Sequence, residues 1–85
     1  MSIPEQQKIS FTDKQGQYLA YIYHYTKLNK CPPAHTDFQK YFSVTPPSVN
    51  QMLNTLEKNG LIKKIPRTAR SISLLIPTDL LPSLK

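Results

Sequence analysis

With 85 residues, the chain has room for one small domain, and its length leaves too little for a catalytic domain with a deep cleft. Eleven Lys and Arg against five Asp and Glu give a formal net charge of +6, which favours a polyanionic partner. The single cysteine, Cys31, excludes an internal disulfide and a cysteine-rich metal site, and no apolar run approaches the roughly 20 residues that span a bilayer.

The first predicted helix begins after Thr12, a residue suited to the N-cap, and ends near Asn29. Asn tolerates the left-handed conformation that closes many helices, and Pro32-Pro33 cannot continue this one. Side chains recur along it at spacings of three and four, which predicts a buried stripe: Tyr18, Leu19, Ile22, Tyr25 and Thr26. Aromatic residues at this spacing are more typical of a core than of a surface that stacks on bases.

A second, shorter helix is predicted at about residues 35–42, with Phe38 and Phe42 one turn apart. Ala34 stands where a capping hydroxyl is expected, so Thr36 is the alternative cap. Neither histidine of the chain has a carboxylate or cysteine at ligand spacing. We therefore expect both histidines on the surface rather than in a metal site.

The third predicted helix, about residues 46–59, has one apolar face and one uncharged polar face. Thr45 is expected to cap it, Pro46 suits its first position, and Asn59-Gly60 ends it. The apolar stripe consists of Val49, Met52, Leu53 and Leu56. The outward positions are Pro47, Ser48, Asn50, Gln51, Asn54 and Thr55. A solvent-exposed face usually favours Glu and Lys, whereas short amides and hydroxyls match the donors and acceptors of base edges; the alternative is a merely polar surface.

Two short strands, residues 61–65 and 71–74, are predicted to enclose a hairpin tip that carries two arginines. Cations cluster around this hairpin, opposed locally only by Glu57: Lys58, Lys63, Lys64, Arg67 and Arg70. Three helices followed by a β-hairpin predict a mainly α fold, the winged helix-turn-helix, in which a three-helix bundle carries a wing. We divide the chain into an N-terminal arm (1–10), a winged-helix domain (11–76) and a C-terminal tail (77–85).

A series of segments extends this pattern: residues 11–15 and 18–22 of the opening helix, the double-proline loop 29–33, and residues 45–49, 53–62 and 70–74. Together they resemble the N-terminal DNA-binding domain of the LexA repressor family, which is itself similar to MarR-type winged helices. Three residues depart from that family's pattern: Ala34 replaces a hydroxyl cap, Gln39 a small residue, and Ser43 a glycine. The family's self-cleaving, dimerising domain has no counterpart in these residues, so neither autoproteolysis nor that route to a dimer is carried over.

These observations predict a protein that binds double-stranded DNA sequence-specifically and regulates transcription. The helix at about 46–59 would lie in the major groove, and the wing, residues 63–70, on the backbone or in the minor groove. Four neutralised phosphates would give a slope of about −4 for the logarithm of the binding constant against the logarithm of the salt concentration. The candidate DNA contacts are Thr45, Pro47, Ser48, Asn50, Gln51, Asn54, Thr55, Lys63, Lys64, Arg67 and Arg70.

Other partners remain open at this point. A winged helix can instead bind a protein partner through its recognition helix, and an RNA duplex is a further alternative. A homodimer is considered because one domain reads only a half-site; its surface would be Tyr23 or the leucines Leu75, Leu80, Leu81 and Leu84, unless the tail packs on its own domain.

Other classes of function are not expected. Residues 1–8 lack the charged and apolar regions of a signal peptide, so we expect a prokaryotic, cytoplasmic, nucleoid-associated protein. No nucleophile lies beside a base, and two glycines leave little room for a phosphate-binding loop. We therefore expect no enzyme, cofactor, metal or small-molecule substrate.

Overall fold

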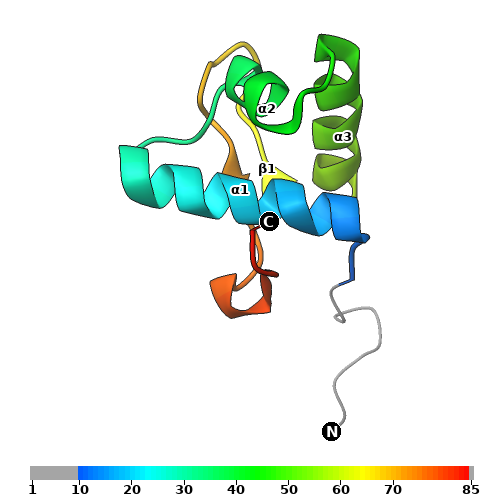
Figure 1. The fold of residues 1–85 in the computed structure, drawn as a ribbon, viewed down its shortest axis with the longest axis vertical. Coiled ribbons are helices and arrows are strands. Elements are labelled where there is room, and N and C mark those ends of the chain that lie inside the picture. Colours follow the sequence, from blue (N-terminus) through cyan, green and yellow to red (C-terminus); the bar gives the residue numbers. More distant parts are fainter. Residues whose placement is uncertain (1–9, 85) are drawn as a thin grey trace, which may run out of the picture.

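The computed structural model describes residues 10–84, so the predicted arm lies outside the described residues except for Ser10. In chain order the elements are α1 (Asp13–Asn29), α2 (His35–Phe42), α3 (Pro46–Lys58), β1 (Ile62–Lys63), β2 (Ser73–Leu74) and the short 3-10 helix η2 (Thr78–Leu80). Figure 1 shows α2 and α3 on one side of α1 and η2 on the other. Three helices and a two-stranded antiparallel hairpin confirm the predicted winged helix-turn-helix plan.

Both ends of α1 follow the prediction, after Thr12 and near Asn29, but the left-handed residue that closes the helix differs. The Thr12 hydroxyl accepts a hydrogen bond from the backbone N–H of Gln15 at 3.1 Å, and the Gln15 side chain accepts from the Thr12 N–H at 3.0 Å, which makes a capping box. At the other end Lys30, with φ 65°, adopts the left-handed conformation expected of Asn29. Asn29 is the last helical residue, and its side-chain amide donates back to the carbonyl of Tyr25 at 3.1 Å.

α2 begins at Ala34 without a capping hydroxyl, and the alternative cap at Thr36 is wrong. The carboxylate of Asp37 accepts the Ala34 N–H at 2.8 Å, which is the other half of a capping box, and the Asp37 N–H donates to the Ala34 carbonyl at 3.0 Å in place of a side-chain cap. At the other end of α2, Ser43 adopts the left-handed conformation with φ 55° in place of a glycine.

The N-cap of α3 lies at Thr45, but its hydroxyl does not bond to the helix backbone. It lies 3.0 Å from the hydroxyl of Ser48 instead. Pro46 and Pro47 at the first two helical positions have no N–H to offer to this hydroxyl. After α3, Gly60 takes φ 76°, which suits the residue that follows a helix end.

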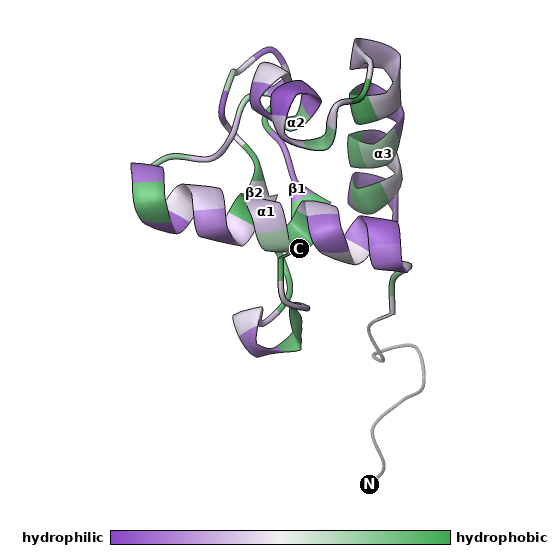
Figure 2. Cartoon of the chain, in the orientation of Figure 1, coloured by the Kyte–Doolittle hydropathy of each residue, from purple (hydrophilic) through white to green (hydrophobic). Residues whose placement is uncertain are grey.

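The core lies where the three helices meet the hairpin. The Tyr18 ring stacks on Phe42 at 4.4 Å and on Phe38 at 5.3 Å between centroids, so Tyr18 is core as predicted, whereas Tyr25 of the same stripe is only partly buried. Met52 packs against this core but is only partly buried. Figure 2 shows the apolar side of α3 turned toward α2 and its polar side turned outward. The buried side chains are Tyr18, Leu19, Tyr21, Ile22, Phe38, Val49, Leu53, Leu56, Leu61, Ile62, Ile72 and Ile76.

The paired strands are shorter than the sequence predicts. Ile62 pairs with Leu74 and Lys63 with Ser73, and Leu75 N–H donates to Leu61 C=O at 3.0 Å. Toward the tip, the Ser71 hydroxyl accepts from the Ile65 N–H at 3.0 Å and donates to the Ile65 C=O at 3.2 Å. A side chain therefore replaces the backbone pair there, and the regular ladder ends.

The C-terminal tail packs on its own domain. The Gln17 side-chain amide donates to the carbonyl of Ser83 at 2.9 Å, and Leu81 and Leu84 pack against the core. Of the tail leucines, Leu80 stays exposed, as does Leu75 just before the tail. No helix within residues 10–84 is long and apolar enough to cross a bilayer.

Candidate nucleic-acid interface

The outer face of α3 is exposed and uncharged, as its residue pattern predicts. Ser48, Asn50, Gln51 and Asn54 are exposed, together with Thr45 and Pro47 at the N-terminal end. Thr55 is half-buried, and its hydroxyl donates to the Gln51 carbonyl at 2.9 Å. The face therefore offers the side-chain amides of Asn50 and Gln51, while the hydroxyls of Thr45 and Ser48 pair with each other and the hydroxyl proton of Thr55 is already used by the helix.

Lys64 is tied to α3 rather than free on the wing. Its ammonium donates to the Asn54 side-chain oxygen at 3.0 Å and lies 3.7 Å from a carboxylate oxygen of Glu57. Such a surface ion pair contributes little to stability. It nevertheless joins the base of the wing to the polar face of α3, and it leaves the NH₂ of Asn54 available to donate.

The tip of the wing presents Arg67. A turn closes with the Thr68 N–H donating to the Ile65 C=O at 3.2 Å, and Arg67 takes φ 61° within it. That conformation is uncommon for a residue with a side chain and has an energetic cost. Within residues 10–84, the side chains of Arg67 and Lys63 make no hydrogen bond or ion pair, so both charges are available to an external anion.

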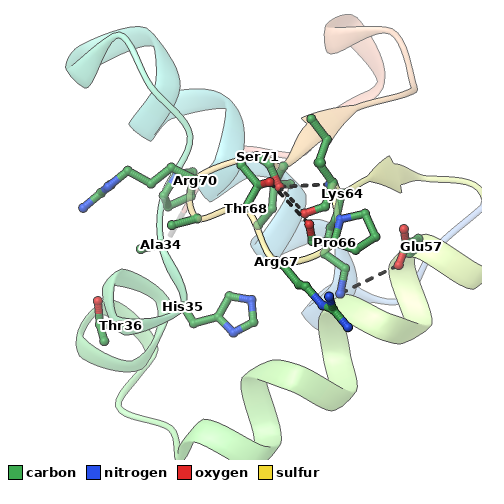
Figure 3. Close-up of a pocket in the computed structure, with 14 residues that line it drawn as sticks. Ala34, His35, Thr36, Glu57, Lys64, Pro66, Arg67, Thr68, Arg70 and Ser71 are labelled. Carbon is green, nitrogen blue, oxygen red and sulfur yellow. Dashed lines mark hydrogen bonds and ion pairs between the residues drawn. The ribbon is translucent and has the colours of Figure 1, made fainter.

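Arg70 is not brought together with the other wing cations. Its Nη1 donates to the Tyr25 hydroxyl at 3.0 Å, the Asp37 carboxylate at 3.1 Å and the Pro32 carbonyl at 3.2 Å. Figure 3 shows its side chain directed away from Lys64 and Arg67. The structure therefore places Arg70, which adopts φ 54°, against α1 and the start of α2 and apart from Lys64 and Arg67, and its predicted DNA contact stays a prediction.

The environment of Asp37 stabilises its charged form. The N–H of Ala34 lowers the pKa of the Asp37 carboxyl below its ordinary value, and the Tyr25 hydroxyl and the Arg70 guanidinium act in the same direction against the effect of burial. The hydrogen bond to Tyr25 is the main cause that raises the pKa of Arg70.

A hollow of about 610 Å³ separates the wing from the first turn of α2 and the end of α3. Its lining includes Pro33, His35, Glu57, Lys64, Pro66 and Arg67. In Figure 3 the His35 ring and the Arg67 side chain point into this space from opposite walls. His35 is exposed, as the sequence predicts, but its place opposite the wing tip depends on long-range folding that no local pattern shows.

A family model, the iron-dependent repressor N-terminal DNA-binding domain, matches residues 10–69, from the start of α1 to the wing tip. The chain belongs to this family. By its description the family is the DNA-binding domain of repressors, so the function that the description names is DNA binding and not catalysis. The match extends through α2 and α3, so the family assignment rests on the same elements that form the exposed polar face and the wing.

The match with individual proteins covers a similar region. The chain is 38% identical over 63 residues to the LexA repressor of Thermosipho melanesiensis and 36% identical over 63 residues to that of Thermosipho africanus. Each match covers 74% of this chain and 32% of the relative, so the chain spans about a third of the length of these relatives. The chain is thus similar to LexA repressors over this region, while the family model that it matches is that of the iron-dependent repressors.

The family description names iron, but the described residues do not fit a resident metal ion. Within residues 10–84, no group of three or more His, Cys, Asp or Glu side chains is placed to hold one. A stable transition-metal site takes about four protein ligands, or about three with an open position.

Proposed function

We propose that the chain binds double-stranded DNA sequence-specifically and thereby regulates transcription, with α3 in the major groove. The observation that carries this proposal is the exposed, uncharged polar face of α3 beside a wing whose Lys63 and Arg67 have no partner within residues 10–84. Membership of a family of DNA-binding repressor domains supports it.

The polar face supplies specificity in this proposal. Ser48, Asn50 and Gln51 are exposed and can contact base edges, and a Gln or Asn amide can bond adenine at two points. Asn54 keeps its NH₂ as a donor while its oxygen holds Lys64. Pro47 offers an apolar surface suited to a thymine methyl group.

The wing supplies affinity that does not depend on sequence. Lys63 and Arg67 would contact phosphates directly, and Lys64 would do so from its position beside α3. Thr45 would lie nearer the phosphate backbone than the bases, at the N-terminal end of α3. Arg67 at the tip would reach furthest from the helix, toward the adjacent backbone or a narrow minor groove.

A complete operator would be read by two copies, because one domain of this size contacts a half-site. Leu81 and Leu84 are covered by their own domain, so a homodimer would use other surfaces, such as Leu75, Leu80 or Tyr23. With chromosomal DNA as the proposed ligand, we infer a prokaryotic, cytoplasmic, nucleoid-associated protein.

A competition titration tests this function. The full chain is titrated with random-sequence duplex DNA, duplex RNA and single-stranded DNA at two salt concentrations, and bound sequences are then selected from a random DNA pool. We expect a preference for duplex DNA and an enriched motif. Loss of all DNA binding at low salt would favour the alternative, a winged helix that binds a protein partner, and a preference for duplex RNA would overturn the choice of ligand.

A further inference from the structure

The geometry points to Arg70 as a positioning residue: it fixes the wing to α1 and α2 and does not itself contact DNA. This inference rests on the proposed function and deepens it, because it concerns how the wing is placed beside the recognition helix. We call the contacts among Arg70, Asp37, Tyr25 and the Pro32 carbonyl the wing latch.

The latch joins segments that lie far apart in the sequence. One guanidinium nitrogen of Arg70 reaches a hydroxyl of α1, a backbone carbonyl of the loop before α2 and a carboxylate of α2, all within 3.0 to 3.2 Å. The guanidinium also lies over the ring of Tyr25, 5.8 Å from its centroid. The Nη1 group of Arg70 is committed to these contacts and its charge faces the Asp37 carboxylate, whereas the side chains of Arg67 and Lys63 have no such partner within residues 10–84.

Asp37 has two roles in the latch. Its carboxylate accepts the Ala34 N–H at 2.8 Å, which begins α2, and it also accepts from Arg70 at 3.1 Å. The side chain of Asp37 is 21% exposed and that of Arg70 41%, so the pair is partly shielded from water. The position of the wing is therefore coupled to the first turn of α2, which packs against α3.

The rest of the hairpin is too weak to hold the wing alone. Each strand has two paired residues, and a hairpin of that size is at best marginally stable by itself. Arg67 and Arg70 both adopt positive φ, so the tip needs contacts that offset this strain. The latch supplies such contacts before DNA arrives, which reduces the ordering that binding must otherwise impose.

Two models of Arg70 predict opposite effects of Asp37→Asn. If Arg70 contacts a phosphate, this substitution releases the guanidinium and removes a negative charge, and DNA binding becomes stronger. If Arg70 is the latch, the substitution loosens the wing, and DNA binding weakens several-fold despite the loss of a negative charge. Arg70→Gln should weaken binding to a similar extent, and the double variant should bind no more weakly than the weaker single variant.

The experiment uses the full chain and a short random-sequence DNA duplex, with fluorescence anisotropy at several salt concentrations. Glu57→Gln is the matched control, because it removes a carboxylate from the same hollow without touching the latch and should not weaken binding. Arg67→Gln is the second control: it removes a cation without an internal partner and should lower the salt slope by about 1. Stronger binding by Asp37→Asn would overturn the latch.

Amide hydrogen exchange without DNA separates the latch from the proposed function. Breaking the latch should speed exchange at Ile65 and Thr68, whose N–H groups hold the wing turn. Unchanged exchange in Arg70→Gln and Asp37→Asn would overturn the latch even if the protein binds DNA. Conversely, faster exchange in a protein that binds no duplex would retain the latch and reject the DNA function. If either variant fails to fold, Tyr25→Phe replaces it, because this substitution keeps the ring and removes the hydroxyl that accepts from Arg70. Hydrogen exchange at Ile65 and Thr68 should then be faster in Tyr25→Phe.

Discussion

Tyr21 lies at the contact between α1 and α2, where its hydroxyl donates to the Asp37 backbone carbonyl at 3.3 Å. Burial raises the pKa of Tyr21 from 10.0 to about 12, and the nearby Asp37, Tyr25 and Tyr41 add to this effect while Arg70 opposes it. The folded state therefore binds the phenolic proton more tightly than the unfolded state does. This contribution to stability is complete below pH 10 and is lost as the pH rises toward 12.

Tyr21→Phe should remove this part of the alkaline loss of stability. The free energy of unfolding, measured by urea denaturation at several pH values from 8 to 12, should fall less steeply in the variant than in the wild type. At neutral pH the variant should be slightly less stable, because it lacks the hydrogen bond to Asp37. Parallel curves for the two proteins across this range would contradict the assignment.

At the scale of the element, α3 separates stability from recognition on its two faces. Leu53 is fully buried, so Leu53→Ala should lower the free energy of unfolding by about 2–5 kcal/mol. Gln51 is exposed and has no packing role, so Gln51→Ala should change stability by less than about 0.5 kcal/mol. Urea denaturation measures both.

The DNA motifs that Gln51→Ala and Leu53→Ala select from a random pool are then compared with the wild-type motif. Gln51→Ala should alter sequence preference at one position by about 1–3 kcal/mol, the value of a good two-point contact. Folded Leu53→Ala should keep the wild-type motif. A large loss of stability in Gln51→Ala would show that the polar face is packed against another part of the protein rather than free.

The contact between α1 and the tail can be tested at Gly16. A Cβ added there would lie 2.9 Å from Pro82 Cγ and 3.0 Å from Phe11 Cε1. Both distances are shorter than an ordinary van der Waals contact, so one or both rings would have to move. Gly16→Ala should therefore destabilise the protein, although Ala favours a helix interior over Gly by about 1 kcal/mol. In a Pro82→Ala background the same substitution should be less harmful or stabilising. Urea denaturation of the four proteins in this cycle measures the coupling.

Gly60→Ala is the matched control for that cycle. Gly60 has φ +76° with no atom within 4 Å of the added Cβ, so its substitution should cost backbone strain alone, about 1–2 kcal/mol. The cost should be the same with or without Pro82. Equal coupling of Gly16 and Gly60 to Pro82 would mean that the tail does not rest on α1.

At the scale of the whole molecule, the sequence predicts what local chemistry determines. The three helices follow from apolar spacing and from end signals such as Thr12 and Pro46, and the exposed face of α3 follows from the same spacing. The length of the strands could not be predicted, because a single hydroxyl, that of Ser71, replaces a backbone pair. The position of Arg70 could not be predicted either, since its partners are brought to it only by the complete fold.

This difference changes the expected charge of the DNA-binding surface. Under the latch proposal Arg70 is committed to Asp37 and Tyr25, and three wing cations remain for phosphates: Lys63, Lys64 and Arg67. At about −0.9 per neutralised phosphate, the salt slope for a random duplex should be about −3, whereas four cations would give about −4. The slope is measured by anisotropy between low and moderate salt with the full chain.

The value of the slope then identifies which charges face the DNA. Arg67→Gln should change the slope from about −3 to about −2. The Arg67 side chain has no partner within residues 10–84, so the substitution removes one phosphate contact and breaks no contact inside the protein. A wild-type slope of about −4 or steeper would place Arg70, or a cation outside the wing, on a phosphate. A slope near zero would mean that the net charge of +6 takes no part in DNA binding and that the wing serves another partner.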